Sequence, residues 1–138
     1  MRIALLLPLV IATTAAPATA EHEVYYRYTV LGYVKDAAGT PRPRQTVELV
    51  RDKTGFSYLG HTDADGLFVI VARLGDESAG EALTLMHGDV RTRLTARFDA
   101  ANHTEERGTR VDVLGGRAVE RPAWFRSTLA NVLGAARR

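Results

Sequence analysis

The stretch VLGYVKDAAGTPRPRQTVELVRDKTGFSYLGHTDADGLF, residues 30–68, decides the fold. Aromatic or β-branched residues alternate with polar ones along the run 24–34, of which this stretch holds the end, and again at 47–49, and clusters of Asp, Gly and Pro separate these runs. Alternation with a period of two is typical of strands that bury one face, and such clusters are typical of turns. The turn at 63–66 accounts for Asp63 and Asp65, because aspartate side chains accept local backbone hydrogen bonds. The stretch therefore predicts three short strands joined by turns.

The same pattern continues beyond residue 68. It is clearest at 90–98, where Val90, Leu94 and Phe98 alternate with arginines. The run 67–74 is almost continuously apolar, which favours burial on both of its faces. Turns at roughly eight- to twelve-residue spacing, with no helix between them, predict an all-β, seven-stranded antiparallel β-sandwich. We expect its strands at 24–34, 46–51, 56–62, 67–74, 83–87, 90–98 and 109–114.

The segment after the last strand has a different pattern. Pro122 suits the first turn of a helix, and the apolar residues after it recur at helical spacing, which predicts a short C-terminal amphipathic helix. We expect Gly115-Gly116 to act as a hinge before it. The helix either packs back on an open sheet face or presents its apolar side to a partner or a membrane surface. The candidate partner-binding residues are Trp124, Phe125, Leu129, Val132 and Leu133.

The motifs of the opening stretch resemble those of the carboxypeptidase regulatory-like domain, a transthyretin-like family. The shared patterns are V-x-G-x-V at 30–34, D-x-x-G-x-P at 36–41, V-x-L at 47–49 and T-D-x-x-G-x-F at 62–68. One departure is Arg44-Gln45, where the family usually has a small Gly-Ala pair. The resemblance implies a Greek-key β-sandwich that serves as a folding, docking or stalk module beside other proteins, and it carries no catalytic residues.

Residues 1–20 have the pattern of a secretory signal peptide. Arg2 precedes an apolar run, and small residues ending in Ala18-Thr19-Ala20 follow it, so we expect cleavage after Ala20 and a periplasmic or secreted location. The apolar run of about ten residues falls short of the roughly 20 that cross a bilayer, so no transmembrane span is expected after cleavage. The expected organisation is a signal peptide at 1–20, a β-sandwich at 21–116 and a C-terminal helix or tail at 117–138.

Composition excludes several classes of function. The chain has no cysteine, which excludes thiol catalysis and thiolate metal sites. Removal of Arg2 with the signal peptide leaves 17 Lys and Arg against 16 Asp and Glu, a balance that gives no reason to expect a nucleic-acid partner. No Ser-His-Asp arrangement, paired-carboxylate motif or glycine-rich phosphate loop can be placed. We therefore predict no catalytic residue and no cofactor.

Two candidate sites remain. His61, His87 and Asp89 are candidate metal ligands, because the turns at 36–41, 63–66 and 87–89 are expected at one end of the sandwich, and imidazole with carboxylate suits a divalent transition metal. The alternative is that these are surface side chains with no metal. Basic residues also line one face of a predicted strand, where they either receive an acidic partner or form a solvated sheet face. This stripe consists of Arg91, Arg93 and Arg97.

We expect a non-enzymatic, exported accessory module that docks onto another exported or membrane protein. The competing hypothesis is small-ligand or transition-metal binding at the His61/His87 end.

Overall fold

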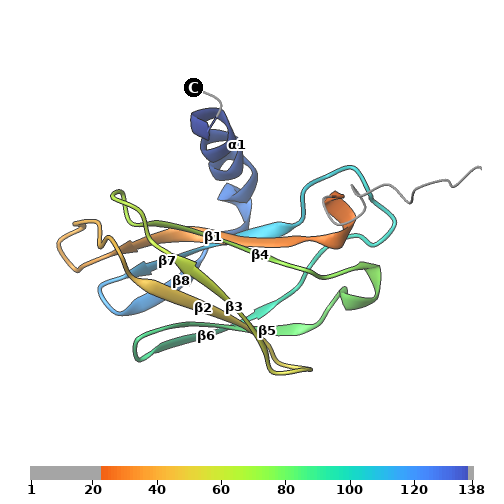
Figure 1. Cartoon of the computed structure of the whole chain (residues 1–138), viewed down its shortest axis with the longest axis horizontal. Helices are drawn as coiled ribbons and strands as arrows, with labels where there is room; N and C mark the ends of the chain where they lie inside the picture. Colours follow the sequence, from red (N-terminus) through yellow and green to blue (C-terminus); the bar gives the residue numbers. More distant parts are fainter. Residues whose placement is uncertain (1–22, 137–138) are drawn as a thin grey trace, which may run out of the picture.

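The computed structural model describes residues 23–136, which form two four-stranded sheets packed face to face and a helix that projects from one of them (Figure 1). Sheet 1 has the strand order β4-β1-β7-β8, and sheet 2 has the order β3-β2-β5-β6. The elements are η2 (Val24–Tyr26), β1 (Tyr28–Lys35), β2 (Thr46–Arg51), β3 (Phe56–His61), β4 (Leu67–Ala72), η3 (Asp76–Ser78), β5 (Ala82–His87), β6 (Val90–Thr95), β7 (Gly108–Leu114), β8 (Arg117–Glu120), η4 (Pro122–Trp124) and α1 (Phe125–Ala136).

The β-sandwich with a short C-terminal helix is confirmed, but it has eight strands instead of the seven predicted. The additional strand, β8, follows Gly115-Gly116, which is a hairpin turn and not the expected hinge. Both glycines have positive φ, 54° and 81°, the conformation of the two-residue turns whose twist matches that of paired strands. The sandwich therefore extends to Glu120, into the 117–138 segment that the sequence assigned to the helix.

The sequence predicted an entirely antiparallel sandwich, and this prediction is wrong for one pair of strands. β1 runs antiparallel to β4 on one side and parallel to β7 on the other. The pairing with β7 joins segments about 80 residues apart, such as Thr29 with Gly108, and a parallel pair needs a long connection of this kind. Local alternation carries no information on such a pairing, so the direction could not be read from the sequence.

The predicted strand boundaries hold best in the middle of the chain. β2 has the predicted bounds, whereas the first strand begins at Tyr28 because Val24–Tyr26 form a 3-10 turn. The prediction that 67–74 is buried on both faces is wrong. Val69 and Val71 are 37% and 49% exposed, because β4 is an edge strand whose outer face remains open.

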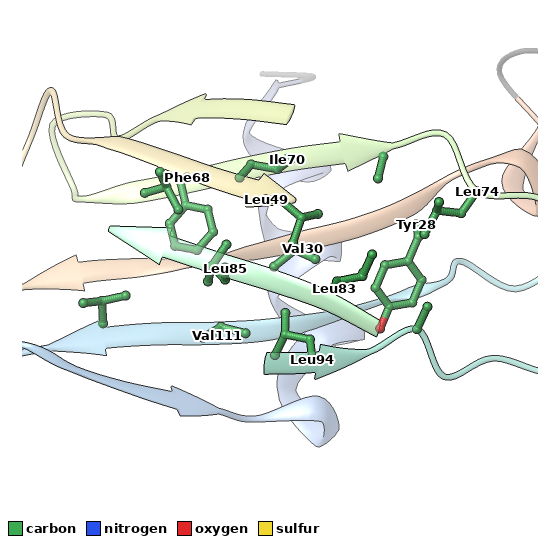
Figure 2. Packing of buried hydrophobic residues seen from close by; sticks show 14 of the residues in the cluster. Tyr28, Val30, Leu49, Phe68, Ile70, Leu74, Leu83, Leu85, Leu94 and Val111 are labelled. Atoms are coloured by element: carbon green, nitrogen blue, oxygen red, sulfur yellow. The ribbon is translucent and has the colours of Figure 1, made fainter. Parts of the chain in front are cut away.

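The core lies between the two sheets and consists of the inward-facing residues of both (Figure 2). The tyrosine ring of Tyr28 fills one end of this layer and Phe68 the other. Removing this apolar surface from water is the main favourable term in folding, worth about 25 cal/mol per Å². The largest fully buried side chains are Tyr28, Phe68, Leu31, Leu49, Ile70, Leu74, Leu83, Leu85, Leu94, Val30, Val34 and Val47.

The turns of the opening stretch form as predicted. Asp63 Oδ1 accepts the backbone N–H groups of Asp65 and Leu67, so turn geometry accounts for this aspartate. Gly66 has a φ of 78°, and its carbonyl accepts the N–H of Val34. The contact joins the 63–66 turn to the strand that leads into the first turn.

Gly32 permits the close approach of β1 to β7. A Cβ atom built at this position would lie 1.7 Å from the carbonyl oxygen of Val111, which is far inside van der Waals contact. In the same place, the N–H of Tyr33 donates to Asp112 Oδ1, at 3.0 Å. The glycine of the V-x-G-x-V motif therefore makes room for the neighbouring strand and for a carboxylate that takes part in the sheet.

Replacement of this glycine by alanine should destabilise the whole domain. We expect Gly32→Ala to lower the free energy of unfolding by at least about 2 kcal/mol, because the new methyl group must displace β7 backbone. Denaturant unfolding followed by circular dichroism measures this loss. The matched control is Gly134→Ala in α1, where no atom lies within 4 Å of the new Cβ, and this variant should gain up to about 1 kcal/mol from helix propensity. Equal effects of the two substitutions would contradict this interpretation of Gly32.

Candidate functional site

A buried carboxylate on β7 connects the sandwich to the C-terminal segment. Asp112 is 1% exposed. Arg110 contacts both of its carboxylate oxygens, with Nε 3.0 Å from Oδ1 and Nη2 2.9 Å from Oδ2. Arg121 Nη1 lies 2.7 Å from Oδ2, and the Tyr33 N–H completes the set. The carboxylate thus has the partners that a buried charge needs.

The two arginines extend this arrangement outward to η4 and α1. Arg110 Nη1 donates to Thr128 Oγ1 at 2.9 Å, and both guanidinium groups lie over the ring of Trp124, at 5.2 Å for Arg110 and 4.7 Å for Arg121. Cation–π contacts of this kind add to the hydrogen bonds. We call Asp112, Arg110, Arg121, Thr128 and Trp124 the Asp112 network.

The base of α1 is fixed to the sheet by packing as well. Phe125 is buried, and a Cβ at Gly108 would lie 2.5 Å from its ring, so only glycine at this position allows the ring so close to β7. Thr128, one turn later, is buried beside Arg110. Phe125 therefore anchors the helix within this chain.

Beyond its first turn, α1 leaves the sheet and projects outward (Figure 1). Leu133 is 46% exposed, and Leu129 and Val132 are half-buried. The sequence left open whether the helix packs on the sheet or stands free. In the structure its first turn packs on the sheet and the rest stands free. No helix within residues 23–136 has the length and apolar character needed to cross a membrane.

The exposed residues of β4 lie on the same sheet face as the helix. Leu31 of β1 pairs with Val69 on one side and with Arg110 on the other. Residues directly opposite each other in a sheet share a face, so Val69 lies on the face that carries the Asp112 network. The same holds for Val71, whose row continues through Thr29 to Gly108 beneath Phe125.

Apolar side chains from two parts of the chain thus border one side of sheet 1. Of the predicted partner-binding residues, Trp124 is 50% exposed, and Leu129, Val132 and Leu133 of the helix are also partly or well exposed. Phe125 is buried. The valines of β4 were not predicted to belong with them. We call this surface the docking face and define it as Val69, Val71, Trp124, Leu129, Val132 and Leu133.

A shallow pocket of about 230 Å³ extends the docking face along one side of α1. Leu129, Ala130 and Leu133 line it from the helix, and Glu105 and Glu106 line it from the loop before β7. The salt bridge from Arg126 to Glu105 ties this loop to the helix. Both ion-pair partners are exposed, so the pair contributes little to stability.

The histidine end of the sandwich has a different arrangement. His61 Nδ1 lies 3.3 Å from Thr46 Oγ1, and His87 Nε2 lies 3.1 Å from Gln45 Oε1. Burial lowers the pKa of His87, with a smaller contribution from Arg42. In residues 23–136 no group of three or more His, Asp or Glu side chains could hold a metal ion. Asp89 is exposed in the turn after His87, and metal binding here stays a prediction.

Sequence reasoning missed the most connected polar groups. Arg110 and Asp112 lie two residues apart on a predicted strand, which places both on one face, and this spacing was the available signal for an ion pair. Arg107 was missed as well, and its side chain is buried. It donates to Asp76 Oδ1 and to the carbonyl oxygens of Tyr25 and Asn102, and its guanidinium lies 4.2 Å from the Phe98 ring. No local pattern in the sequence marks Arg107 as buried.

Comparison with known proteins gives no family assignment. No protein-family model and no curated protein sequence matches this chain. Among solved structures, an (S)-allantoin synthase is similar with a TM-score of 0.49 and 13% identity over 72% of this chain, and the match spans 44% of that protein.

A second solved structure is the dioxygenase domain of a dioxygenase carbohydrate-binding protein fusion from Streptomyces sp. SirexAA-E. Its TM-score is 0.40 at 16% identity, over 77% of this chain and 80% of that domain. Likenesses this distant carry no conclusion about activity.

Loss of the Asp112 charge should detach the helix base from the sheet. We expect Asp112→Asn to lower the free energy of unfolding by about 3 kcal/mol, because two arginines lose the buried carboxylate that they share. Trp124 is the only tryptophan of the chain, so the fluorescence emission of the protein reports on the base of the helix. This emission should change in the folded variant.

The control is Glu105→Gln, which breaks the exposed pair with Arg126 and should cost less than about 1 kcal/mol. Unfolding curves by circular dichroism and by Trp124 fluorescence measure both effects. A variant Asp112→Asn with wild-type stability and emission would show that the network does not hold the helix.

Proposed function

We propose that this protein is a non-enzymatic, exported accessory module that binds another exported or membrane protein through its docking face. The observation that carries this proposal is the exposure of apolar side chains on sheet 1 and on a segment whose base contacts that sheet through Phe125 and the Asp112 network. Leu133 on the helix, Trp124 in η4 just before it, and Val71 on the sheet are each about half exposed. Clusters of exposed apolar side chains on one face are typical of interaction surfaces.

The position of α1 favours a protein partner over a lipid surface. The helix stands off the plane of sheet 1, so the two halves of the docking face do not lie in one plane (Figure 1). A flat bilayer surface could meet the helix or the β4 valines, but not both together. A partner segment lying in the angle between them would contact both, as peptides do when they dock beside a helix.

Charge at the edge of the docking face indicates the character of this partner. The Asp112 network places two guanidinium groups around one carboxylate. Lys35 adds an ammonium group 5.3 Å from the Tyr33 ring, and Arg110 lies 5.1 Å from the same ring. Basic groups around an apolar centre favour a partner segment that combines apolar side chains with Asp or Glu.

Two expectations from the sequence, family membership and export, support this proposal and are part of it. We infer membership of the carboxypeptidase regulatory-like family, with its Greek-key, transthyretin-like topology, from the motifs of residues 30–68. Export to the periplasm or the cell exterior rests on residues 1–20, which lie outside the described residues. No observation at the His61/His87 end favours the alternative of ligand or metal binding there.

Site-specific crosslinking tests the proposal in the cell that produces the protein. A photoreactive amino acid at position 133 or 71 should give a covalent adduct with a defined second protein of the cell envelope. The same amino acid at Leu59, which is 61% exposed on β3 of the opposite sheet, is the control and should give no such adduct.

The purified partner then allows a quantitative test. The double variant Val71→Glu/Leu133→Glu should raise Kd by about tenfold or more, whereas Leu59→Glu should leave it within about twofold. Adducts at position 59 equal to those at 133, or no adduct at either docking-face position, would contradict docking through this face.

A further inference from the structure

A second cavity opens where the edge strands of the two sheets meet, separate from the docking face. It has a volume of about 260 Å³ and lies between β6 of sheet 2 and the β7–β8 side of sheet 1. An adjoining cavity of about 300 Å³ shares Arg97, Gly108 and Pro122 with it. We call the first cavity the edge cleft, and its polar lining is Tyr28, Arg93, Thr95, Arg97, Thr109 and Glu120.

Arg97 is the cation of the edge cleft without a carboxylate partner. Within residues 23–136 it forms no salt bridge, whereas Arg107 and Arg126, which line the adjoining cavity, are paired with Asp76 and Glu105. Arg93 has only a long contact with Asp52, at 3.8 Å. A guanidinium group that lines a cavity and lacks an anion is a ready site for a carboxylate, because its N–H groups form a fork that matches two oxygens.

The phenol of Tyr28 forms part of the floor. Its ring is buried in the core, and its oxygen points toward the β6 side (Figure 2). The hydroxyl lies 3.5 Å from the carbonyl oxygen of Thr95, at the limit of a hydrogen bond. Burial raises the pKa of Tyr28 to about 12, with a further increase from the charge of Glu120 and a decrease from Arg97. The hydroxyl is therefore protonated at neutral pH, and it can donate to a ligand in exchange for its long bond to Thr95.

Glu120 supplies the opposite charge in the same cleft. One of its oxygens accepts the Thr109 hydroxyl at 2.8 Å, which fixes its position. A bare anion beside Arg97 would meet repulsion from this carboxylate, whereas a ligand with a hydroxyl or ammonium group next to its own carboxylate would satisfy both. The edge cleft thus offers a cation, a neutral donor and an anionic acceptor together.

We propose that the edge cleft binds a small organic acid that carries a hydroxyl or ammonium group beside its carboxylate. Arg97 takes the carboxylate, the Tyr28 hydroxyl donates to one of its oxygens, and Glu120 accepts from the neighbouring hydroxyl or ammonium group. This assigns part of the arginine stripe at 91–97 to a site, since Arg97 lies two residues beyond the end of β6. Arg91, on β6 itself, does not line the edge cleft and stays on the solvated face.

Titrations monitored by NMR of the backbone amides test this site with four probes. D-Gluconate supplies a carboxylate with hydroxyls, L-serine supplies a carboxylate with an ammonium and a hydroxyl, acetate supplies the carboxylate alone, and glucose supplies hydroxyls alone. We expect gluconate or serine to shift the amides of residues 95–97 and 108–109, and their comparison identifies the preferred donor. Acetate and glucose should bind at least about tenfold more weakly.

Two variants locate the binding. Arg97→Gln should raise the Kd of the bound probe by about tenfold or more, while Arg91→Gln, the matched control on β6, should leave this Kd within about twofold. Circular dichroism checks that both variants are folded. The proposal is overturned if neither gluconate nor serine shifts these amides at about 10 mM, if acetate binds as well as they do, or if the two variants weaken binding equally. These outcomes are independent of partner binding at the docking face.

Discussion

The carboxylate of Asp112 is the group that joins the sandwich to its projecting helix. It occupies a place in the β1–β7 pair where the Tyr33 N–H needs an acceptor, and Gly32 leaves the space that this close approach requires. Its charge holds Arg110 and Arg121, which reach Thr128 and Trp124 at the base of the helix. Breaking a buried ion pair on one side is costly, so strand pairing and helix orientation depend on the same group.

Parts of the fold with a local cause could be predicted from the sequence. β2 and the turn at Asp63 follow from alternation and from aspartate chemistry within a few residues. Features that depend on distant contacts could not be predicted. The parallel pairing of β1 with β7 and the exposure of Val69 on an edge strand belong to this class. The strand β8 was missed because a Gly-Gly pair is compatible with both a hinge and a tight turn.

The candidate site shows the same division. The helix residues were found from their spacing, yet the structure divides them between an anchor, Phe125, and an exposed set that includes Leu133. The sheet half of the docking face was hidden in a run that resembled a fully buried strand. The arginines of the 91–97 stripe likewise have different surroundings, since Arg97 lines a cavity and Arg91 does not. Alternation predicts which face a side chain occupies, but not what else reaches that face.

The angle between α1 and the sheet is the quantity to measure, because the docking face exists only if this angle is fixed. The chain has no cysteine, so single cysteines introduced at Ala130 of α1 and Arg91 of β6 can be spin-labelled without background. Electron–electron double resonance should give a narrow distance distribution in the wild-type protein and a broad one after Asp112→Asn, while circular dichroism shows both to be folded. A distribution that is broad in the wild-type protein, or equally narrow in both, would contradict the role assigned to Asp112.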